Sequence, residues 1–231
     1  MKVLGVIPAR GGSKSVPRKN IQLLAGIPLI AHTIRSAQES RRLTHFLTST
    51  DDKEIADVAA QAGSAVLMRP TDLAQDETPM PPVLLHALDE EEKQGRAYDV
   101  VVLLQPTCPL RRGTEIDGAL DHLEAQGADV VISVYQVSDA HPARMYHLRD
   151  NRLSPVAPQW EMANRQVLPP VYHRNGVIYA ARVPVFRQKK TFYVHNAAPF
   201  VMPKESAVNI DDPLDLKFAA MILSESGLAN S

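Results

Sequence analysis

The sequence predicts a three-layer α/β fold, in which helices cover both faces of a mostly parallel β-sheet. Apolar, β-branched segments that fit strands alternate with segments whose apolar residues recur at helical spacing. The apolar run YDVVVLLQ at 98–105 is typical of a strand buried on both faces. Such alternation favours parallel strands joined by right-handed crossovers, and a length of 231 residues suits one domain.

The expected elements follow one another regularly over the first 138 residues. Strands are predicted at 2–8, 44–50, 64–70, 98–105 and 129–137, and helices at 28–40, 52–62, 78–95 and 113–127. Prolines in the first turn support two of the helix starts, because a proline there removes no helical hydrogen bond. Asp51 is expected to cap the helix at 52–62, which Gly63 ends.

The regular alternation stops near residue 138. Residues 139–176 contain five prolines and no clean periodicity, so they form either a long functional loop or a small subdomain inserted into the sheet. Strands resume at 176–183 and 198–202, and a final helix is expected at 212–226. We therefore expect a single domain over 1–231 with an inserted region at 139–170.

Composition and charge argue against several classes of protein. The only cysteine, Cys108, cannot form an intramolecular disulfide, and no apolar stretch approaches the ~20 residues of a membrane helix. The N-terminal apolar run is too short for a signal peptide, so a cytoplasmic protein without membrane contact is expected. Nucleic acid binding is disfavoured, because no aromatic residues interleave with the basic residues near the N-terminus.

The segment IPARGGSKSVPRKN at 7–20 is the most informative functional signal. It places Gly11 and Gly12 directly after the first buried strand, at the edge of an α/β sheet where ligands bind. Glycine allows the backbone to approach a ligand closely, and successive N–H groups in such a turn bind anions. The loop also carries the basic residues Arg10, Lys14, Arg18 and Lys19. A polyphosphate suits this loop, although its adjacent glycines match neither G-x-x-x-x-G-K-[ST] nor G-x-G-x-x-G.

The motif ARGGSKSVPRKN resembles the signature of the acylneuraminate cytidylyltransferases, which include enzymes for legionaminic and pseudaminic acids. More distantly, it is similar to the cytidylyltransferase for the eight-carbon acid sugar of lipopolysaccharide. The resemblance continues in order through AGIPLIAHTI (25–34), STDD (49–52), RPTDLAQDETP (69–79), HAL (86–88), LLQPTCPLR (103–111), HP (141–142), RQVLPP (165–170), RNGVIYA (174–180) and NIDDPLDL (209–216). It implies a Rossmann-like sheet of the nucleotide-diphospho-sugar transferase type, and a homodimer formed through 139–170.

The resemblance also implies a reaction, the transfer of CMP from CTP to an acidic 2-keto sugar with release of pyrophosphate. The anomeric hydroxyl of the sugar would attack the α-phosphate, a step that needs charge neutralisation and in-line positioning. The implied catalytic residues are Arg10, Lys14 and Lys19. The implied nucleotide site combines these three with Ala9, Gly11, Gly12, Ser13 and Asn20.

The acid sugar requires a partner for its carboxylate, and arginine suits bidentate binding of that group. By resemblance, the sugar site includes Gln105, Arg144, Arg165, Asn175 and Tyr179. Two of these have plain structural interpretations as well. Gln105 fits a polar residue at a strand end, and Tyr179 fits a core position.

Mg²⁺ is the expected cofactor, at a segment that departs from the family pattern. Many members have D-x-D where this sequence has Asn209-Ile210-Asp211, so an amide replaces the first carboxylate. Mg²⁺ often uses one or two carboxylates plus substrate phosphates, so a weaker site on Asp211 is expected, with Asn209 open as a second ligand. Asp212 and Asp215 are better explained as the cap and first-turn charge of the final helix.

Two other functions stay open from the sequence. One is a cytidylyltransferase for another acid sugar, such as the eight-carbon keto-deoxy-octulosonate. The other is a non-catalytic nucleotide sensor with the same fold, which Asn209 motivates. Cys108 has no basic neighbour in sequence and the histidines lack metal-ligand spacing, so neither a nucleophilic thiol nor a histidine metal site is expected. No general base is assigned.

Overall fold

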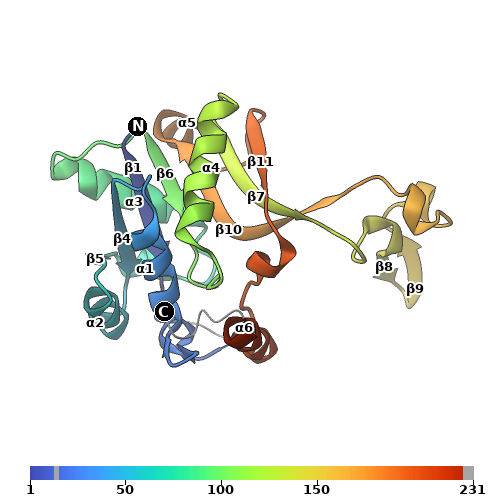
Figure 1. Cartoon of the computed structure of the whole chain (residues 1–231), viewed down its shortest axis with the longest axis horizontal. Helices are drawn as coiled ribbons and strands as arrows, with labels where there is room; N and C mark the ends of the chain where they lie inside the picture. The colour runs from blue at the N-terminus through green and yellow to red at the C-terminus, as the bar shows by residue number, and fades with distance from the viewer. Residues whose placement is uncertain (13–15, 226–231) are drawn as a thin grey trace.

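The computed structural model describes residues 1–12 and 16–225, and its centre is a seven-stranded sheet between two layers of helices (Figure 1). In space the strands follow the order β11-β7-β10-β6-β1-β4-β5. Their bounds are β1 Val3–Pro8, β4 His45–Thr50, β5 Ala65–Met68, β6 Val100–Leu103, β7 Val130–Gln136, β10 Tyr172–Arg182 and β11 Ala197–Val201. All neighbouring pairs are parallel except the two that involve β10. The mostly parallel α/β fold is confirmed.

The helices divide between the two faces of the sheet. One face is covered by α1 (Leu29–Glu39), α2 (Lys53–Gln61) and α4 (Gly113–Ala125), and the other by α3 (Met80–Lys93) and α5 (Val183–Lys189). The final helix, α6 (Pro213–Glu225), packs in a third, smaller cluster with Leu24 and Ile210. Among the helices formed by residues 1–12 and 16–225, none is both long and apolar enough to cross a membrane.

The strand β1 illustrates how one sequence segment joins both layers. Successive side chains of a strand point to opposite faces of the sheet. Val3 and Ile7 therefore enter the cluster beneath α1, α2 and α4, while Leu4 and Val6 enter the cluster beneath α3 and α5. All four side chains are fully buried, which explains why the strand has a continuous apolar sequence rather than an alternating one.

Three local expectations are corrected by the structure. The N-cap of α2 is Asp52, not Asp51, because the carboxylate of Asp52 accepts a hydrogen bond from the N–H of Ile55 at 3.0 Å. The helix α5 follows β10 directly and was not expected. It has only seven residues, which give too short a periodic pattern to predict a helix. The strand β10 also begins earlier than expected, at Tyr172, and runs antiparallel to both neighbours.

Residues 139–170 form an arm that extends away from the sheet beyond β7 and β10 (Figure 1). The arm carries an antiparallel hairpin of β8 (Tyr146–Arg149) and β9 (Arg152–Pro155). A two-strand ribbon is formed by β2 (Leu23–Leu24) and β3 (Ile27–Pro28). The short 3₁₀ helices are η1 Lys19–Ile21, η2 Thr71–Ala74, η3 Pro142–Arg144, η4 Pro158–Trp160, η5 Arg165–Val167 and η6 Lys204–Ala207. Large apolar side chains are exposed on the arm, among them Leu148, Leu153 and Met162.

Candidate active site

A cavity of about 380 Å³ opens where β1 and β6 end. This edge is the usual ligand site of an open α/β sheet, because the strand ends and following loops leave a crevice there. The lining residues come from distant parts of the chain: Pro8, Arg10, Lys19, Asn20, Arg69, Met80, Gln105, Pro106, Thr107 and Asp211. Three of them are cations and one is an anion, so the cavity suits a negatively charged ligand.

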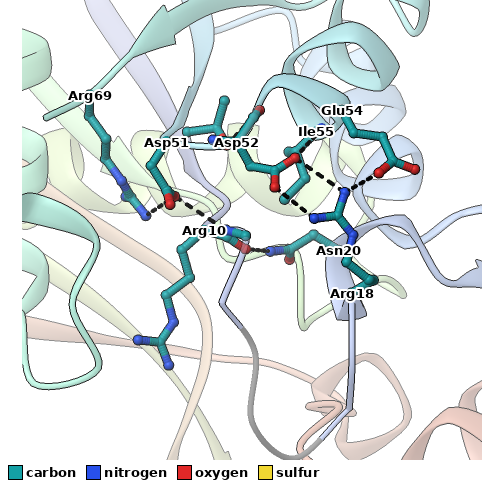
Figure 2. A network of polar contacts seen from close by, with 10 residues as sticks. Arg10, Arg18, Asn20, Asp51, Asp52, Glu54, Ile55 and Arg69 are labelled. Carbon is teal, nitrogen blue, oxygen red and sulfur yellow. Dashed lines mark hydrogen bonds and ion pairs between the residues drawn. The ribbon is translucent and has the colours of Figure 1, made fainter. Parts of the chain in front are cut away.

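The loop after β1 borders this cavity, and a side-chain hydrogen bond joins its two ends. The amide of Asn20 is buried and donates a hydrogen bond to the carbonyl oxygen of Arg10 at 2.9 Å (Figure 2). The backbone at Gly11 lies so close to α2 that a Cβ atom would meet a carboxylate oxygen of Asp52 at 2.6 Å. A Cβ at Gly12 would meet no atom of the described residues within 4 Å. Gly11 is thus required for close packing, whereas Gly12 leaves its backbone accessible.

The N–H of Gly11 has a protein partner rather than pointing freely into the loop. It donates to Oδ1 of Asp51 at 3.2 Å. The expected set of successive free N–H groups therefore does not include Gly11. Ser13 and Lys14, which were also expected to bind the nucleotide, lie outside the described residues.

Two basic residues of the loop have different orientations. The Nζ of Lys19 lies in the cavity, where it donates to the carbonyl oxygen of Ile210 at 2.9 Å and lies 3.8 Å from Oδ1 of Asp211. Arg18 turns to the opposite side and pairs with Asp52 at 2.6 Å and with Glu54 (Figure 2). Its charge thus holds the loop against α2, and Arg18 is not among the residues that line the cavity.

Arg10 lies at the mouth of the cavity in an ion pair. Its guanidinium is 2.8 Å from Oδ1 of Asp76, and both side chains are about one-third exposed. Ala9, the preceding residue, is fully buried, and its N–H donates to the carbonyl oxygen of Ser49 at 2.9 Å. The strand end is thereby fixed while the Arg10 side chain stays accessible to a ligand.

Arg69 is a cavity residue that the sequence analysis did not single out. Its side chain is only 2% exposed and lies 3.7 Å from Oδ1 of Asp51. Within the described part of the chain, its Nε and one terminal nitrogen have no hydrogen-bond partner. Burial lowers the pKa of this guanidinium, and Asp51 opposes that shift. A buried cation with unused donors is a strong candidate for binding an acceptor-rich ligand. The available sequence signals were its position after a short strand and its place at the start of the resembling segment RPTDLAQDETP.

The segment expected to bind metal lies at the rim of the same cavity. Asn209 and Asp211 share one side of the segment, since the amide nitrogen of Asn209 donates to Oδ2 of Asp211 at 2.5 Å. Ile210 between them is buried and its N–H donates to the carbonyl oxygen of Thr107 at 2.8 Å. The Asp211 carboxylate is exposed to solvent beside Lys19, so its oxygen fits the preference of Mg²⁺ for one or two carboxylates plus phosphates. No group of three or more potential acidic, histidine or cysteine ligands occurs among residues 1–12 and 16–225.

The next two carboxylates have structural roles at the start of α6. Oδ1 of Asp212 accepts hydrogen bonds from the N–H groups of Leu214 and Asp215, at 2.7 Å and 3.0 Å. Oδ2 of Asp215 accepts in return from the N–H groups of Asp211 and Asp212. Such a reciprocal cap satisfies N–H groups at a helix start. It also fixes the backbone of Asp211 at the cavity rim.

Comparisons with known proteins identify the family. A family model described as Cytidylyltransferase matches residues 4–219. The chain is 37% identical to the CMP-N,N'-diacetyllegionaminic acid synthase of Legionella pneumophila, over 93% of each protein. The chain belongs to the cytidylyltransferase family. An N-acylneuraminate cytidylyltransferase of Streptococcus agalactiae is 31% identical over 91% of this chain, but the match spans about half of that longer protein (51%).

The fold of the cytidylyltransferase is shared with a solved structure of lower sequence similarity. The structure of CMP:2-keto-3-deoxy-manno-octonic acid synthetase complexed with CTP superposes with a TM-score of 0.74. It covers 98% of this chain and all (100%) of that chain, at 17% identity. At that identity the likeness establishes the fold alone.

The residues expected to bind the sugar fall into separate parts of the cytidylyltransferase. Gln105 lines the 380 Å³ cavity, and its amide donates to the carbonyl oxygen of Gly176 at 3.3 Å. Arg165 lines a second cavity, of about 500 Å³, at the base of the arm with Gln136, His141 and Pro169 among its neighbours. Arg144 lies in η3 of the arm and is exposed. The two cavities share no lining residue, so Arg165 and Gln105 face different cavities of the same chain.

Asn175 and Tyr179 on β10 are both buried. The Oδ1 of Asn175 accepts hydrogen bonds from Oγ of Ser133 at 2.5 Å and from the N–H of Val177 at 3.1 Å. The ring of Tyr179 packs on Phe192 with a centroid distance of 5.3 Å, and burial raises the pKa of its hydroxyl to about 12. Neither is among the residues that line the two cavities. Their environment supports a structural role in the sheet.

Cys108 and His86 both lie outside the candidate cavity. The Cys108 thiol is fully buried, and burial raises its pKa to about 11, so it is protonated at neutral pH. The His86 ring lies 4.0 Å from Glu90 one turn further along α3. Neither residue lines the 380 Å³ cavity.

Proposed function

We propose that this cytidylyltransferase transfers CMP from CTP to a nonulosonic acid, a sialic-acid-like 2-keto sugar acid, and releases pyrophosphate. The main observation in favour is the convergence of Arg10, Lys19 and Arg69 on one cavity at the carboxyl ends of β1 and β6. Two cations from the loop after β1 and one from the end of β5 suit a triphosphate, which carries several charges and many acceptor oxygens. The names of the relatives in legionaminic and sialic acid synthesis support the acid sugar as acceptor.

The cationic side chains bind the triphosphate and stabilise the charge that develops during the transfer. Arg10 and Lys19 neutralise charge on the triphosphate while the accessible backbone at Gly12 approaches it. Charge that develops on the leaving pyrophosphate is stabilised by the same fixed cations, because they need no reorganisation during the reaction. Lys14 belongs to this proposed set on the strength of the resemblance alone.

Mg²⁺ is part of the proposal, with Asp211 as its protein ligand and Asn209 beside it. The ion would supply additional charge neutralisation on the triphosphate. In the structure the Asn209 amide nitrogen faces Asp211, so Asn209 would have to turn its oxygen outward to act as a ligand. Lys19 lies 3.8 Å from Asp211, so its charge is beside the proposed metal ligand.

A homodimer completes the proposed sugar site. Arg144 and Arg165 lie on or at the base of the arm, away from Gln105 of the same chain. An arm with exposed apolar side chains such as Leu148 and Met162 is suited to contact a second copy. The partner's arm would then bring its arginines to the sugar carboxylate. A cytoplasmic location is also proposed, because CTP is available there.

A substrate panel tests the function directly. The purified protein is incubated with CTP, Mg²⁺ and either neuraminic, legionaminic or pseudaminic acids or the eight-carbon keto-acid, and pyrophosphate release is measured with kcat/KM for each acid. Turnover with a nine-carbon acid supports the proposal, and a preference for the eight-carbon acid would redirect it. CTP binding without pyrophosphate release from any acid would instead favour a nucleotide sensor.

A further inference from the structure

Asp51 connects the phosphate-binding loop with the buried cation of the cavity. It is the first residue after β4, and its Oδ1 accepts a hydrogen bond from the N–H of Gly11 at 3.2 Å. The same oxygen lies 3.7 Å from a terminal nitrogen of Arg69. Figure 2 shows Asp51 between the two, with Arg69 on one side and the loop backbone on the other. One carboxylate oxygen thus holds the loop backbone at Gly11 and pairs with Arg69, which lines the ligand cavity.

Asp51 offsets part of the cost of burying the charge of Arg69. A guanidinium that is 2% exposed is separated from water, which penalises its charged form. Arg10 lies close enough to add repulsion, whereas Asp51 offsets part of the cost. The Nε and one terminal nitrogen of Arg69 have no partner among the described residues. The side chain therefore has an ion-pair partner in Asp51, 3.7 Å away, and donors left for a ligand.

We propose that Asp51 is a positioning residue for CTP. It holds the loop after β1 and the Arg69 guanidinium in the relative positions at which both contact the same nucleotide. The inference rests on the proposed function. Asp51 does not touch the ligand and acts through its two partners. A simpler alternative is that Asp51 only stabilises the corner between β4 and α2.

The two roles predict opposite changes in CTP affinity when the charge of Asp51 is removed. A carboxylate near a site for a triphosphate repels the ligand, so removing its charge alone would tighten CTP binding. If Asp51 positions Arg69, Asp51→Asn weakens CTP binding, because the guanidinium loses its charged anchor while the amide oxygen can still accept from Gly11. We expect Asp51→Asn to raise the Kd of CTP roughly tenfold.

Calorimetric titration with Mg²⁺ present tests the proposal without requiring turnover. The ligands are CTP and inorganic triphosphate, and thermal unfolding checks that each variant is folded. Asp51→Asn is expected to lose affinity for both CTP and inorganic triphosphate, because Arg69 is one of the three cations assigned to the triphosphate. Asp57→Asn, an exposed carboxylate on α2, is the charge-matched control and should leave both Kd values unchanged.

A double-mutant cycle with Arg69→Met makes the test specific to the pair. The losses in Asp51→Asn and Arg69→Met should be non-additive, since each removes the same arrangement. Additive losses, or unchanged or tighter CTP binding in Asp51→Asn, would overturn the positioning role. If Asp51→Asn does not fold, Asp51→Glu is titrated in its place. It keeps the charge but displaces the carboxylate by one methylene group, so weaker CTP binding is expected and unchanged CTP binding would overturn the positioning role. Failure of the wild-type protein to bind CTP would count against the proposed function itself.

Discussion

The amide of Asn20 donates a hydrogen bond to the carbonyl oxygen of Arg10 at 2.9 Å and so joins the two ends of the phosphate-binding loop. Asn20 is buried, so this bond is shielded from water. Because Arg10 and Lys19 both line the cavity, the distance between their backbones is set in part by this side chain. The relationship predicts that Asn20 affects nucleotide binding by holding the loop in shape.

We expect Asn20→Ala to raise the KM for CTP about tenfold and to lower the free energy of unfolding by about 1 kcal/mol, through loss of one buried hydrogen bond. Asn20→Asp should be worse, because a carboxylate cannot donate to the Arg10 carbonyl oxygen and also repels the triphosphate. Steady-state kinetics and urea denaturation measure both effects. Gln22→Ala, which removes an exposed amide bonded to the Pro17 carbonyl, is the control. Equal KM values in the two alanine variants would contradict the assignment.

The ion pair between Arg18 and Asp52 predicts a pH dependence of stability. The hydrogen bond from Arg18 holds the pKa of the Asp52 carboxyl below its usual range. A carboxyl with a depressed folded-state pKa contributes stability that is present above its unfolded pKa of about 4 and is lost as the pH falls through the lower folded-state pKa. Arg18 is 39% exposed, so solvent screens the pair and limits its contribution to at most about 1 kcal/mol.

We therefore expect Arg18→Ala to be less stable than wild type at pH 7 and to approach wild-type stability below about pH 4. Chemical denaturation at several pH values measures the difference in the free energy of unfolding. Arg41→Ala, at an exposed arginine after α1, provides a control for loss of a surface cation. A difference from wild type that stays constant from pH 7 to pH 3 would show that the pair is not its origin.

Arg165 is predicted to act on the sugar and not on the nucleotide, since it lines the cavity at the base of the arm. Arg165→Ala should raise the KM for the acid sugar by at least about tenfold, because a bidentate charged contact to the carboxylate is lost. The KM for CTP should change little. Equal increases in both KM values would contradict the assignment of Arg165 to the sugar. Arg165→Lys should restore only part of the affinity, because lysine cannot make the planar bidentate contact.

Asn209 is predicted to limit metal affinity. Asn209→Asp would place a second carboxylate beside Asp211, where the two side chains are now 2.5 Å apart. We expect a several-fold lower Mg²⁺ concentration at half-maximal activity, because a second anionic ligand strengthens the site. Without Mg²⁺ the adjacent charges should repel, so the melting temperature should fall and recover on addition of the ion.

The control for this prediction is Asn151→Asp, which adds the same charge in the turn of the exposed hairpin. An unchanged Mg²⁺ requirement in Asn209→Asp would mean that the ion is held away from this segment. A change of similar size in both variants would indicate a general charge effect.

Much of the fold could be predicted because its signals are local. The run at 98–105 is apolar at every position that β6 buries, and the glycine pair after β1 marks the loop beside the cavity. Capping was predicted less accurately. Asp51 and Asp52 are adjacent and chemically identical, and only backbone geometry decides that Asp52 caps α2 while Asp51 turns to Gly11.

The sequence by itself determined the alternation of strands and helices, the basic glycine loop and the family resemblance, since each depends on neighbouring residues. Only the tertiary structure decided that Arg69 joins Arg10 and Lys19 in one cavity, and that Arg165 lies apart from Gln105. These arrangements depend on the order of strands in the sheet and on the direction of the arm. Contacts between residues far apart in the chain leave no periodic pattern, so their physical basis appears only when the sheet is assembled.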